Sequence, residues 1–475
     1  MRYFANESTI LMRKLAVLLP LALLALFASQ LTSCKKDTFL SEGNLDFSAD
    51  TVVFDTVFTT VGSTTQRLKI YNRSNRNLRV DEIELMGGEN SPFRINVDGI
   101  SGVLHNNLEI EGSDSLWIFV EVTLDPNGGT LPLIVEDSIR FRTNGVDQYV
   151  VLAAWGQDAY FWNNEVMPQG TLPNDKPHVV YGYAAVDEGE TITIQAGTDI
   201  YLHNNSLIYV FKGALHIQGT KTDPVTLQGD RLEAEYDDVS GQYYGIYFQE
   251  ALPSTIDHAI IKNGIAGVHL FSEDPSNSSY TLEMSNTTIQ NCSRYGTFIY
   301  DGAKVKAENC VISDNGIHAF LLLRGGDFNF NHCHLLSYGP GDNVGAAIGI
   351  TNYFDDTIGP INEGTITNSV IYGNGDYEVA MDTLTQGTIV LDFQRNVIRA
   401  DDPFTDAFYT NGNIWNANPL FNDIPGLDYM WSASSPLNGA GDSAFGITLG
   451  MNPGTDICEN PRDAVSPDIG AYELP

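Results

Sequence analysis

The chain has 475 residues, 60 of them acidic and 25 basic, and its formal net charge of −35 excludes nucleic acid as a partner, because phosphate binding requires clustered lysines and arginines. Only 18 % of the residues are charged and 43 % are hydrophobic, which excludes a disordered acidic tail and predicts a large buried core. The 44 glycines and 20 prolines indicate many turns, and the high content of Tyr and Phe is typical of an all-β protein.

The chain begins with the pattern of an export signal. Arg13 and Lys14 precede an apolar run at residues 15–28, which is interrupted only by Pro20. This run is too short to span a bilayer comfortably, and a basic start before a short apolar stretch is typical of a secretion signal. We therefore expect the mature protein to be exported.

The residues that follow predict a lipid anchor. Leu31-Thr32-Ser33-Cys34 resembles the lipobox of bacterial lipoproteins, and Lys35-Lys36-Asp37 is similar to the start of mature lipoproteins of the Bacteroidetes type. The resemblance implies that residues 1–33 are removed, that Cys34 is lipidated, and that a tether at 34–45 attaches the protein to the outer membrane. The alternative is an ordinary signal peptide followed by a buried cysteine. Periplasmic and external orientation both remain open.

Residues 46–156 predict a β-sandwich. Apolar and polar residues alternate in several short runs, among them 52–58, 67–71 and 115–123, with turn residues between them and no helical periodicity. About seven such strands in about 110 residues are typical of a sandwich of two sheets. The segments 68–72 and 154–156 resemble the immunoglobulin-like domains of spindle- and cilia-associated proteins. That resemblance implies a role in spacing or protein contact.

A repeat follows the predicted sandwich. The pattern apolar-x-apolar-x-polar-x-x-apolar occurs at 282–289, 305–312 and 328–335, so its last position advances by 23 residues each time. Looser copies end at Ile261, Ile371 and Ile398. The spacing of two within each copy predicts strands, and the Asn or His at the polar position suits a tight left-handed bend. We therefore predict a solenoid of stacked coils, because a β-propeller blade would need about 40–50 residues.

The solenoid resembles a known family. Residues 192–198 and 242–248 look like coils of the right-handed parallel β-helix, the architecture of pectate lyases and many bacterial surface proteins. The segments 418–421, 434–442 and 467–473 resemble the terminal segment of such surface proteins. The resemblance implies an all-β chain with a β-helix at 157–408 and a C-terminal cap at 409–475 that shields the last coil.

The repeat places polar side chains in one stripe on the outside of a sheet. Glu283, Lys306 and Asn329 occupy equivalent positions in consecutive copies, and Glu308 lies two residues after Lys306. A catalytic interpretation makes Lys306 the base of a polysaccharide lyase, with Glu283 or Glu308 on a cation. The alternative is a solvated sheet face with charge pairs. The aspartate pairs at 237–238, 355–356 and 401–402 lack the surroundings of glycosidase motifs.

Two further clusters contain histidine or cysteine, and we predict neither a metal site nor a disulfide in them. His332-Cys333-His334 has the composition of a metal site, but His332 occupies the bend position usually held by Asn, so we expect no metal. Cys310 and Cys333 share a repeat position, and we expect free buried thiols in preference to a disulfide. No cofactor is predicted, except that calcium would be required if a uronate polymer were bound against the negative charge.

Two functions remain. The favoured one is a non-catalytic envelope lipoprotein that binds polysaccharide or a surface protein, or spaces other components. The alternative is a polysaccharide lyase or glycoside hydrolase acting on the polar stripe. The stripe contains only one lysine in a mostly acidic row, and this composition favours the non-catalytic function.

Overall fold

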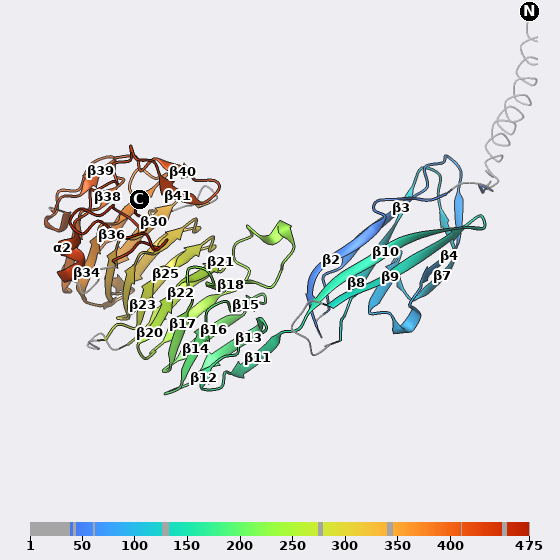
Figure 1. The fold of residues 1–475 in the computed structure, drawn as a ribbon, viewed down its shortest axis with the longest axis horizontal. Helices are drawn as coiled ribbons and strands as arrows, with labels where there is room; N and C mark the ends of the chain where they lie inside the picture. Colours follow the sequence, from blue (N-terminus) through green and yellow to red (C-terminus); the bar gives the residue numbers. More distant parts are fainter. Residues whose placement is uncertain are drawn as a thin grey trace, which may run out of the picture. The chain divides into compact units, whose positions relative to one another are not determined.

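The computed structural model describes residues 39–40, 44–59, 62–125, 133–273, 279–339, 345–409, 411–448 and 454–474. The predicted signal segment and Cys34 lie outside the described residues. The described chain forms two compact units, one up to residue 156 and one from residue 157 onward (Figure 1). In the part of the chain that is described, no helix combines the length and apolar character needed to cross a membrane.

The first unit is a sandwich of two antiparallel sheets, as the alternation predicts. One sheet contains, in hydrogen-bonded order, β1 (Asp46–Phe47), β3 (Gln66–Tyr71), β8 (Ser115–Val122), β5 (Phe93–Val97) and β6 (Ile100–Ser101). The other contains β2 (Thr51–Phe58), β10 (Val146–Gln157), β9 (Leu133–Thr143), β4 (Leu78–Leu85) and β7 (Leu104–Ile110), and the 3-10 turn η1 (Gly88–Asn90) precedes β5.

Alternate residues of these strands form the core of the sandwich. Leu68, Ile70 and Phe141 are fully buried between the sheets, while their neighbours along each strand face outward. The described part of this unit has ten strands where about seven were expected, and two of the ten, β1 and β6, are only two residues long. The relation to immunoglobulin-like domains in particular stays a prediction.

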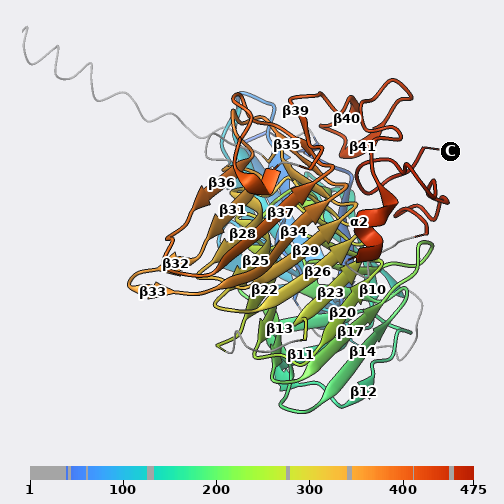
Figure 2. The same cartoon turned by 90° about the vertical axis from the view of Figure 1, so that its left-hand side faces the viewer.

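The second unit is a solenoid of three parallel ladders, each with one strand from every complete coil. The first, which we call the polar sheet, contains β12 (Gly170–Thr171), β14 (Thr191–Gln195), β17 (Ala214–Gln218), β20 (Ser254–Asp257), β23 (Leu282–Ser285), β26 (Lys304–Glu308), β29 (Asp327–Asn331), β34 (Ile361–Thr367) and β37 (Ile389–Gln394). Figure 2 shows these strands stacked in sequence order.

The other two ladders are joined through β13. The short-strand sheet contains β15 (Asp199–Leu202), β18 (Val225–Gly229), β21 (Ala259–Lys262), β24 (Thr288–Gln290), β27 (Val311–Ser313), β30 (His334–Ser337), β35 (Val370–Gly373), β38 (Val397–Ile398) and β39 (Ile414–Trp415). The third, which we call the aromatic sheet, contains β11 (Tyr160–Val166), β13 (His178–Val186), β16 (Leu207–Phe211), β19 (Gly245–Gln249), β22 (Ala266–Phe271), β25 (Tyr295–Tyr300), β28 (His318–Leu323), β31 (Ile348–Thr351) and β36 (Val379–Asp382).

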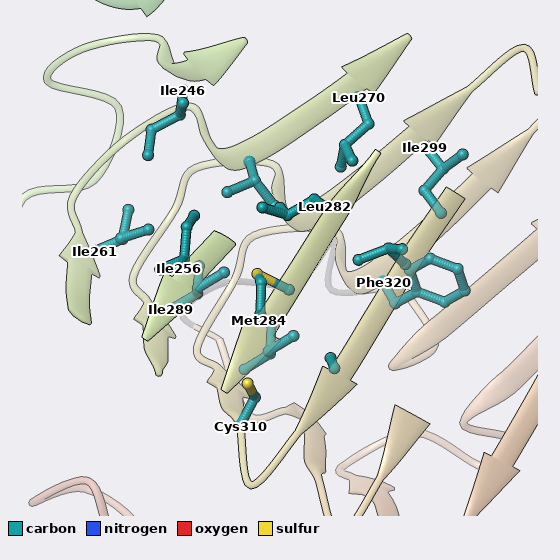
Figure 3. Packing of buried hydrophobic residues seen from close by; sticks show 14 of the residues in the cluster. Ile246, Ile256, Ile261, Leu270, Leu282, Met284, Ile289, Ile299, Cys310 and Phe320 are labelled. Atoms are coloured by element: carbon teal, nitrogen blue, oxygen red, sulfur yellow. The ribbon is translucent and has the colours of Figure 1, made fainter. Parts of the chain in front are cut away.

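The predicted register of the repeat is confirmed. Ile289 pairs with Ile261 on one side and with Ile312 on the other, and Leu335, Ile371 and Ile398 continue the same row. These side chains point into the solenoid with Leu282, Met284 and other apolar residues. Figure 3 shows Ile261 and Ile289 of this row together with Leu282 and Met284. Because every coil contributes the same apolar positions, the core extends continuously along the axis.

The polar position of the repeat is a left-handed bend, as predicted. At the corner between the polar sheet and the short-strand sheet, Asn286, Asn309 and His332 have φ values of 47°, 53° and 51°. Asn309 donates a side-chain hydrogen bond of 3.1 Å to Asn286, and Asn286 donates one of 3.0 Å to Asp257. Asparagine tolerates this conformation, and its amide also links successive coils.

The C-terminal region differs from the single cap that was expected. Phe404, Tyr409 of η3 (Ala407–Tyr409) and Trp415 pack against the end of the core, where Tyr409 stacks on Phe393 at 4.9 Å. Residues 418–448 and 454–474, which we call the strap, lie along the side of the solenoid (Figure 2). The strap contains β40 (Phe421–Asp423), β41 (Asp428–Trp431) and α2 (Ser443–Thr448).

The strap packs on the outer face of the short-strand sheet. Tyr429, Trp431 and Leu437 of the strap form an apolar cluster with Val311 and Leu336 of β27 and β30. Two smaller elements complete the described fold, the hairpin of β32 (Tyr353–Phe354) and β33 (Thr357–Ile358), and the turn η2 (Ala234–Tyr236).

Candidate functional site

The polar stripe predicted from the repeat has the expected neighbours. Glu283 of β23 pairs with Lys306 of β26, and Lys306 pairs with Asn329 of β29. Glu308 lies in the adjacent row, opposite Ser285 on one side and Asn331 on the other. The three candidate residues therefore lie on one face of the polar sheet, on two consecutive coils.

The stripe is not a continuous solvated face, however. Asn329 and Asn331 are buried, at 1 % and 0 % exposure. Tyr280 accounts for part of this burial, because it accepts a hydrogen bond of 2.5 Å from Asn329 and donates one of 3.2 Å to Glu363. The ammonium group of Lys306 lies 5.9 Å from the centre of the Tyr280 ring. Tyr280 thus lies across the part of the stripe where a lyase would require access.

Electrostatics in the stripe also differ from those of an open charge pair. Burial raises the pKa of the Glu308 carboxyl, while Lys306 lowers it. The nearby carboxylates of Asp257 and Glu283 raise it further. Glu308 is therefore a half-buried acid, so the description of a solvated sheet face with charge pairs does not fit this position. Glu308 pairs in register with Asn331, which is fully buried, and the Arg462 guanidinium of the strap is close enough to lower the pKa of Glu308.

The histidine and cysteine clusters lie inside the protein. His332 and His334 are both buried beneath the strap, where Trp431 and Tyr472 pack against the ring of His334. Burial lowers the pKa of His334 to about 3. Cys310 and Cys333 are buried thiols at equivalent positions. Among the described residues, no group of three or more His, Cys, Asp or Glu has the arrangement of a metal site.

The most distinctive surface of the solenoid lies on the aromatic sheet. Tyr209, Tyr247, His269 and Phe298 occupy equivalent outward positions on β16, β19, β22 and β25. Their rings lie face to face, with centroid separations of 5.7, 4.5 and 4.5 Å in that order. We call these four side chains the ring stack. A second row beside it contains Phe211, Gln249, Phe271 and Tyr300.

Hydrogen bonds hold the ring stack in place. The hydroxyl group of Tyr209 donates a bond of 2.6 Å to the side-chain oxygen of Gln249. His269 shares a bond of 2.7 Å with the hydroxyl group of Tyr244. Burial between its neighbours lowers the pKa of His269 to about 4, so the ring is neutral at physiological pH. The stack is therefore an ordered, uncharged surface.

Two adjoining grooves lie at the β13 end of this surface. The first has a volume of about 530 Å³ and is almost entirely apolar, with Tyr183, Tyr209, Phe211 and Val166 around it and Asp187 at one side. The second, of about 850 Å³, begins at Phe211 and is polar, with Lys212, Gln249, Glu250 and Glu273 in its lining. Volumes of roughly 300–1,000 Å³ are typical of small-molecule sites. The pair thus combines ring faces with carboxylate and amide groups.

These grooves were not identified from the sequence, although a signal is present. The outward positions of 207–211, 243–249 and 295–300 carry an excess of Tyr and Phe where polar residues are usual. The candidates Glu283, Lys306 and Glu308 belong to the polar sheet, whereas the grooves lie on the aromatic sheet. The structure therefore gives two separate candidate surfaces.

Comparison with known proteins agrees with the solenoid. Residues 184–339 match a family model described as a right handed beta helix region. No curated protein matches the sequence. Together with the three parallel ladders, the family match identifies the second unit as a right-handed parallel β-helix.

Solved structures with similar regions are distant. The catalytic unit of the GH87 α-1,3-glucanase from Streptomyces thermodiastaticus is 10 % identical, covers 69 % of this chain and 73 % of its own, and has a TM-score of 0.30. Pectate lyase Pel9A is 12 % identical, with 64 % and 89 % covered and a TM-score of 0.28. A PapD-like domain of human CEP192 is 10 % identical, with 26 % and 91 % covered and a TM-score of 0.18. Similarity at this level carries no statement about activity.

Proposed function

We propose that this protein is a membrane-anchored lipoprotein of the bacterial cell envelope whose β-helix binds a glycan without cleaving it. The observation that carries the proposal is the pair of grooves on the aromatic sheet, where ordered rings adjoin carboxylate and amide groups. Sugars present apolar C–H faces and a rim of hydroxyl groups, so they match a surface of this composition. The lipobox at Cys34 supports the anchoring part of the proposal.

Rigidity of the groove favours binding. The ring stack is built on consecutive strands, and Tyr209 is additionally fixed by its bond to Gln249. Side chains that are already ordered lose little conformational entropy when a ligand binds. The surface is therefore suited to recognition of a weakly binding, flexible polymer.

The polar stripe supports the non-catalytic part of the proposal. The ammonium group of Lys306 lies over the ring of Tyr280, 5.9 Å from its centre, and the amides of Asn329 and Asn331 on the next coil are buried. A lyase base must reach the proton that it removes from the substrate. A lyase or hydrolase on this face remains the alternative, and it predicts product formation that Lys306→Ala abolishes.

The test uses the full chain purified in detergent and a panel of neutral and uronic-acid polysaccharides. We expect retention of at least one polysaccharide without new reducing ends or unsaturated products. The double variant Tyr209→Ala/Phe211→Ala should lose retention, whereas Tyr149→Ala, which removes an exposed tyrosine from the sandwich, should retain it. Turnover of any member, or equal retention by all three proteins, would contradict the proposal.

A further inference from the structure

The ring stack ends abruptly at Tyr209. The residue paired with Tyr209 on the preceding coil is Ala185 of β13, and the one before it is Val166 of β11. Ala185 contributes only a methyl group where each of the next four coils has a ring. One face of Tyr209 is stacked on Tyr247, and Tyr209 and Ala185 both line the apolar groove on this side of the stack.

This space is the apolar groove of about 530 Å³. We call it the Ala185 hollow. Tyr183 and Leu207 bound it on one side, and Asp187 and Phe211 bound it on the other. Consecutive parallel strands lie about 4.8 Å apart, which is close to the spacing of stacked rings, so one further ring would continue the stack. The hollow thus lies at the position where the next ring of the stack would be.

The lining specifies the chemistry of that ring. The face of Tyr209 is apolar and electron-rich, which suits the C–H face of a pyranose. The Asp187 carboxylate lies at the edge, where it can accept hydrogen bonds from sugar hydroxyl groups. Glu188 and Glu250 line the adjoining groove, and Lys212 is the cation there, placed 5.2 Å from the Phe211 ring. The excess of carboxylates disfavours an anionic sugar.

We propose that the Ala185 hollow binds one neutral pyranose unit, stacked on Tyr209 as the next ring of the ring stack, with the adjoining sugars in the polar groove. The inference rests on the proposed glycan-binding function and adds the place and the charge class of the bound unit. An aromatic side chain of a partner protein is the competing occupant, because it would also stack on Tyr209.

The test is the variant Ala185→Phe, which supplies the missing ring from the protein itself. The new ring stacks on Tyr209, so the melting temperature should not fall, whereas affinity for neutral oligosaccharides should fall by about tenfold or more. Ala153→Phe makes the same change at an outward position of β10 and should leave affinity unchanged. Tyr209→Leu, which removes the stacking face and leaves the hollow open, should lose affinity to a similar degree.

Calorimetric titration of the full chain separates the outcomes. Neutral oligosaccharides should bind more tightly than oligouronates of the same length, and N-acetyltyrosine amide should not compete. Failure of the wild-type chain to bind any glycan would overturn the proposed function and this inference together. Wild-type binding that Ala185→Phe and Tyr209→Leu leave intact would overturn the inference alone. Preference for oligouronates, or binding of N-acetyltyrosine amide in place of sugars, would also overturn it.

Discussion

Arg462 of the strap donates a hydrogen bond of 2.8 Å to the side-chain oxygen of Asn309, a bend residue 153 positions earlier in the chain. The guanidinium group also forms an ion pair of 3.2 Å with Glu473 and a bond of 3.0 Å to the carbonyl oxygen of Gly470. Arg462 and Glu473 are only 3 % and 7 % exposed. One buried arginine thus joins the C-terminal end of the strap to the corner of the β-helix.

Replacing Arg462 should lower the free energy of unfolding of the β-helix. In Arg462→Met the carboxylate of Glu473 keeps its buried position without its cation, and breaking a buried ion pair on one side costs about 3–5 kcal/mol. Urea unfolding of the β-helix measures the loss. Arg73→Met removes an exposed pair with Asp46, where the expected loss is about 0–1 kcal/mol. Equal effects of the two variants would show that the buried pair does not hold the strap.

The repeat makes a second prediction about inward and outward positions. Ile312 is fully buried in the core, so Ile312→Asp should prevent folding of the β-helix, because an unpaired buried charge costs several kcal/mol. Glu283 is exposed at an outward position of β23, and Glu283→Gln should change stability by less than about 0.5 kcal/mol. Circular dichroism and thermal unfolding compare the two. A folded Ile312→Asp protein would contradict the inward assignment.

Glu308 is unsuitable as the silent control, although its repeat position alone would suggest it. It points outward from β26, but it is half-buried, and burial raises its pKa. The repeat predicts the direction of a side chain correctly and does not predict its exposure. Exposure also depends on contacts with segments outside the repeat, such as the hydrogen bond between Tyr280 and the outward Asn329.

The fold could be predicted because its determinants are local and periodic. Alternation places Leu282 and Met284 inside, and Asn286 supplies the left-handed bend, so one copy of the repeat specifies one coil. Equal spacing of the next two copies then fixes the register between Ile289, Ile312 and Leu335. The path of the strap could not be predicted this way, because its contacts with Asn309 and Val311 join distant, non-repeating segments.

The aromatic grooves could not be predicted from the sequence for a related reason. Tyr209 and Tyr247 are neighbours in space, but a loop containing η2 separates β18 from β19, so their spacing in the chain does not follow the 23-residue period. The later members of the stack are also unequally spaced in the chain, because His269 follows Tyr247 by 22 residues and Phe298 follows His269 by 29. A stack whose members come from coils of unequal length is visible only when the register of the strands is known. The residues of the polar stripe have regular spacing, which is why they were found.

The lipid anchor is tested directly at Cys34. A Cys34→Ala variant has no thiol to carry the lipid, so we expect it to leave the membrane fraction or to accumulate with its signal segment attached. Membrane fractionation and the mass of the mature chain measure this, and Cys458→Ala serves as the matched control. Wild-type fractionation and processing of Cys34→Ala would exclude a lipoprotein.

The ring stack also predicts a pH dependence of stability. The pKa of His269 is lowered to about 4 by burial, against about 6.5 in an unfolded chain. The unfolded chain therefore binds this proton first, so the stabilisation is complete above pH 6.5 and is lost as the pH falls from 6.5 to 4. Other buried histidines, such as His334, act in the same direction.

His269→Phe keeps a ring between Tyr247 and Phe298 but removes the titrating group. We expect the loss of unfolding free energy between pH 7 and pH 4.5 to be smaller in this variant than in the wild type by about 2 kcal/mol. Phe298→Leu disturbs the same stack without a change in titration and should lower stability equally at both pH values. Denaturant unfolding of the three proteins at the two pH values measures these differences in unfolding free energy. A His269→Phe protein with the full wild-type pH dependence would show that His269 is protonated in the folded β-helix as readily as in the unfolded chain.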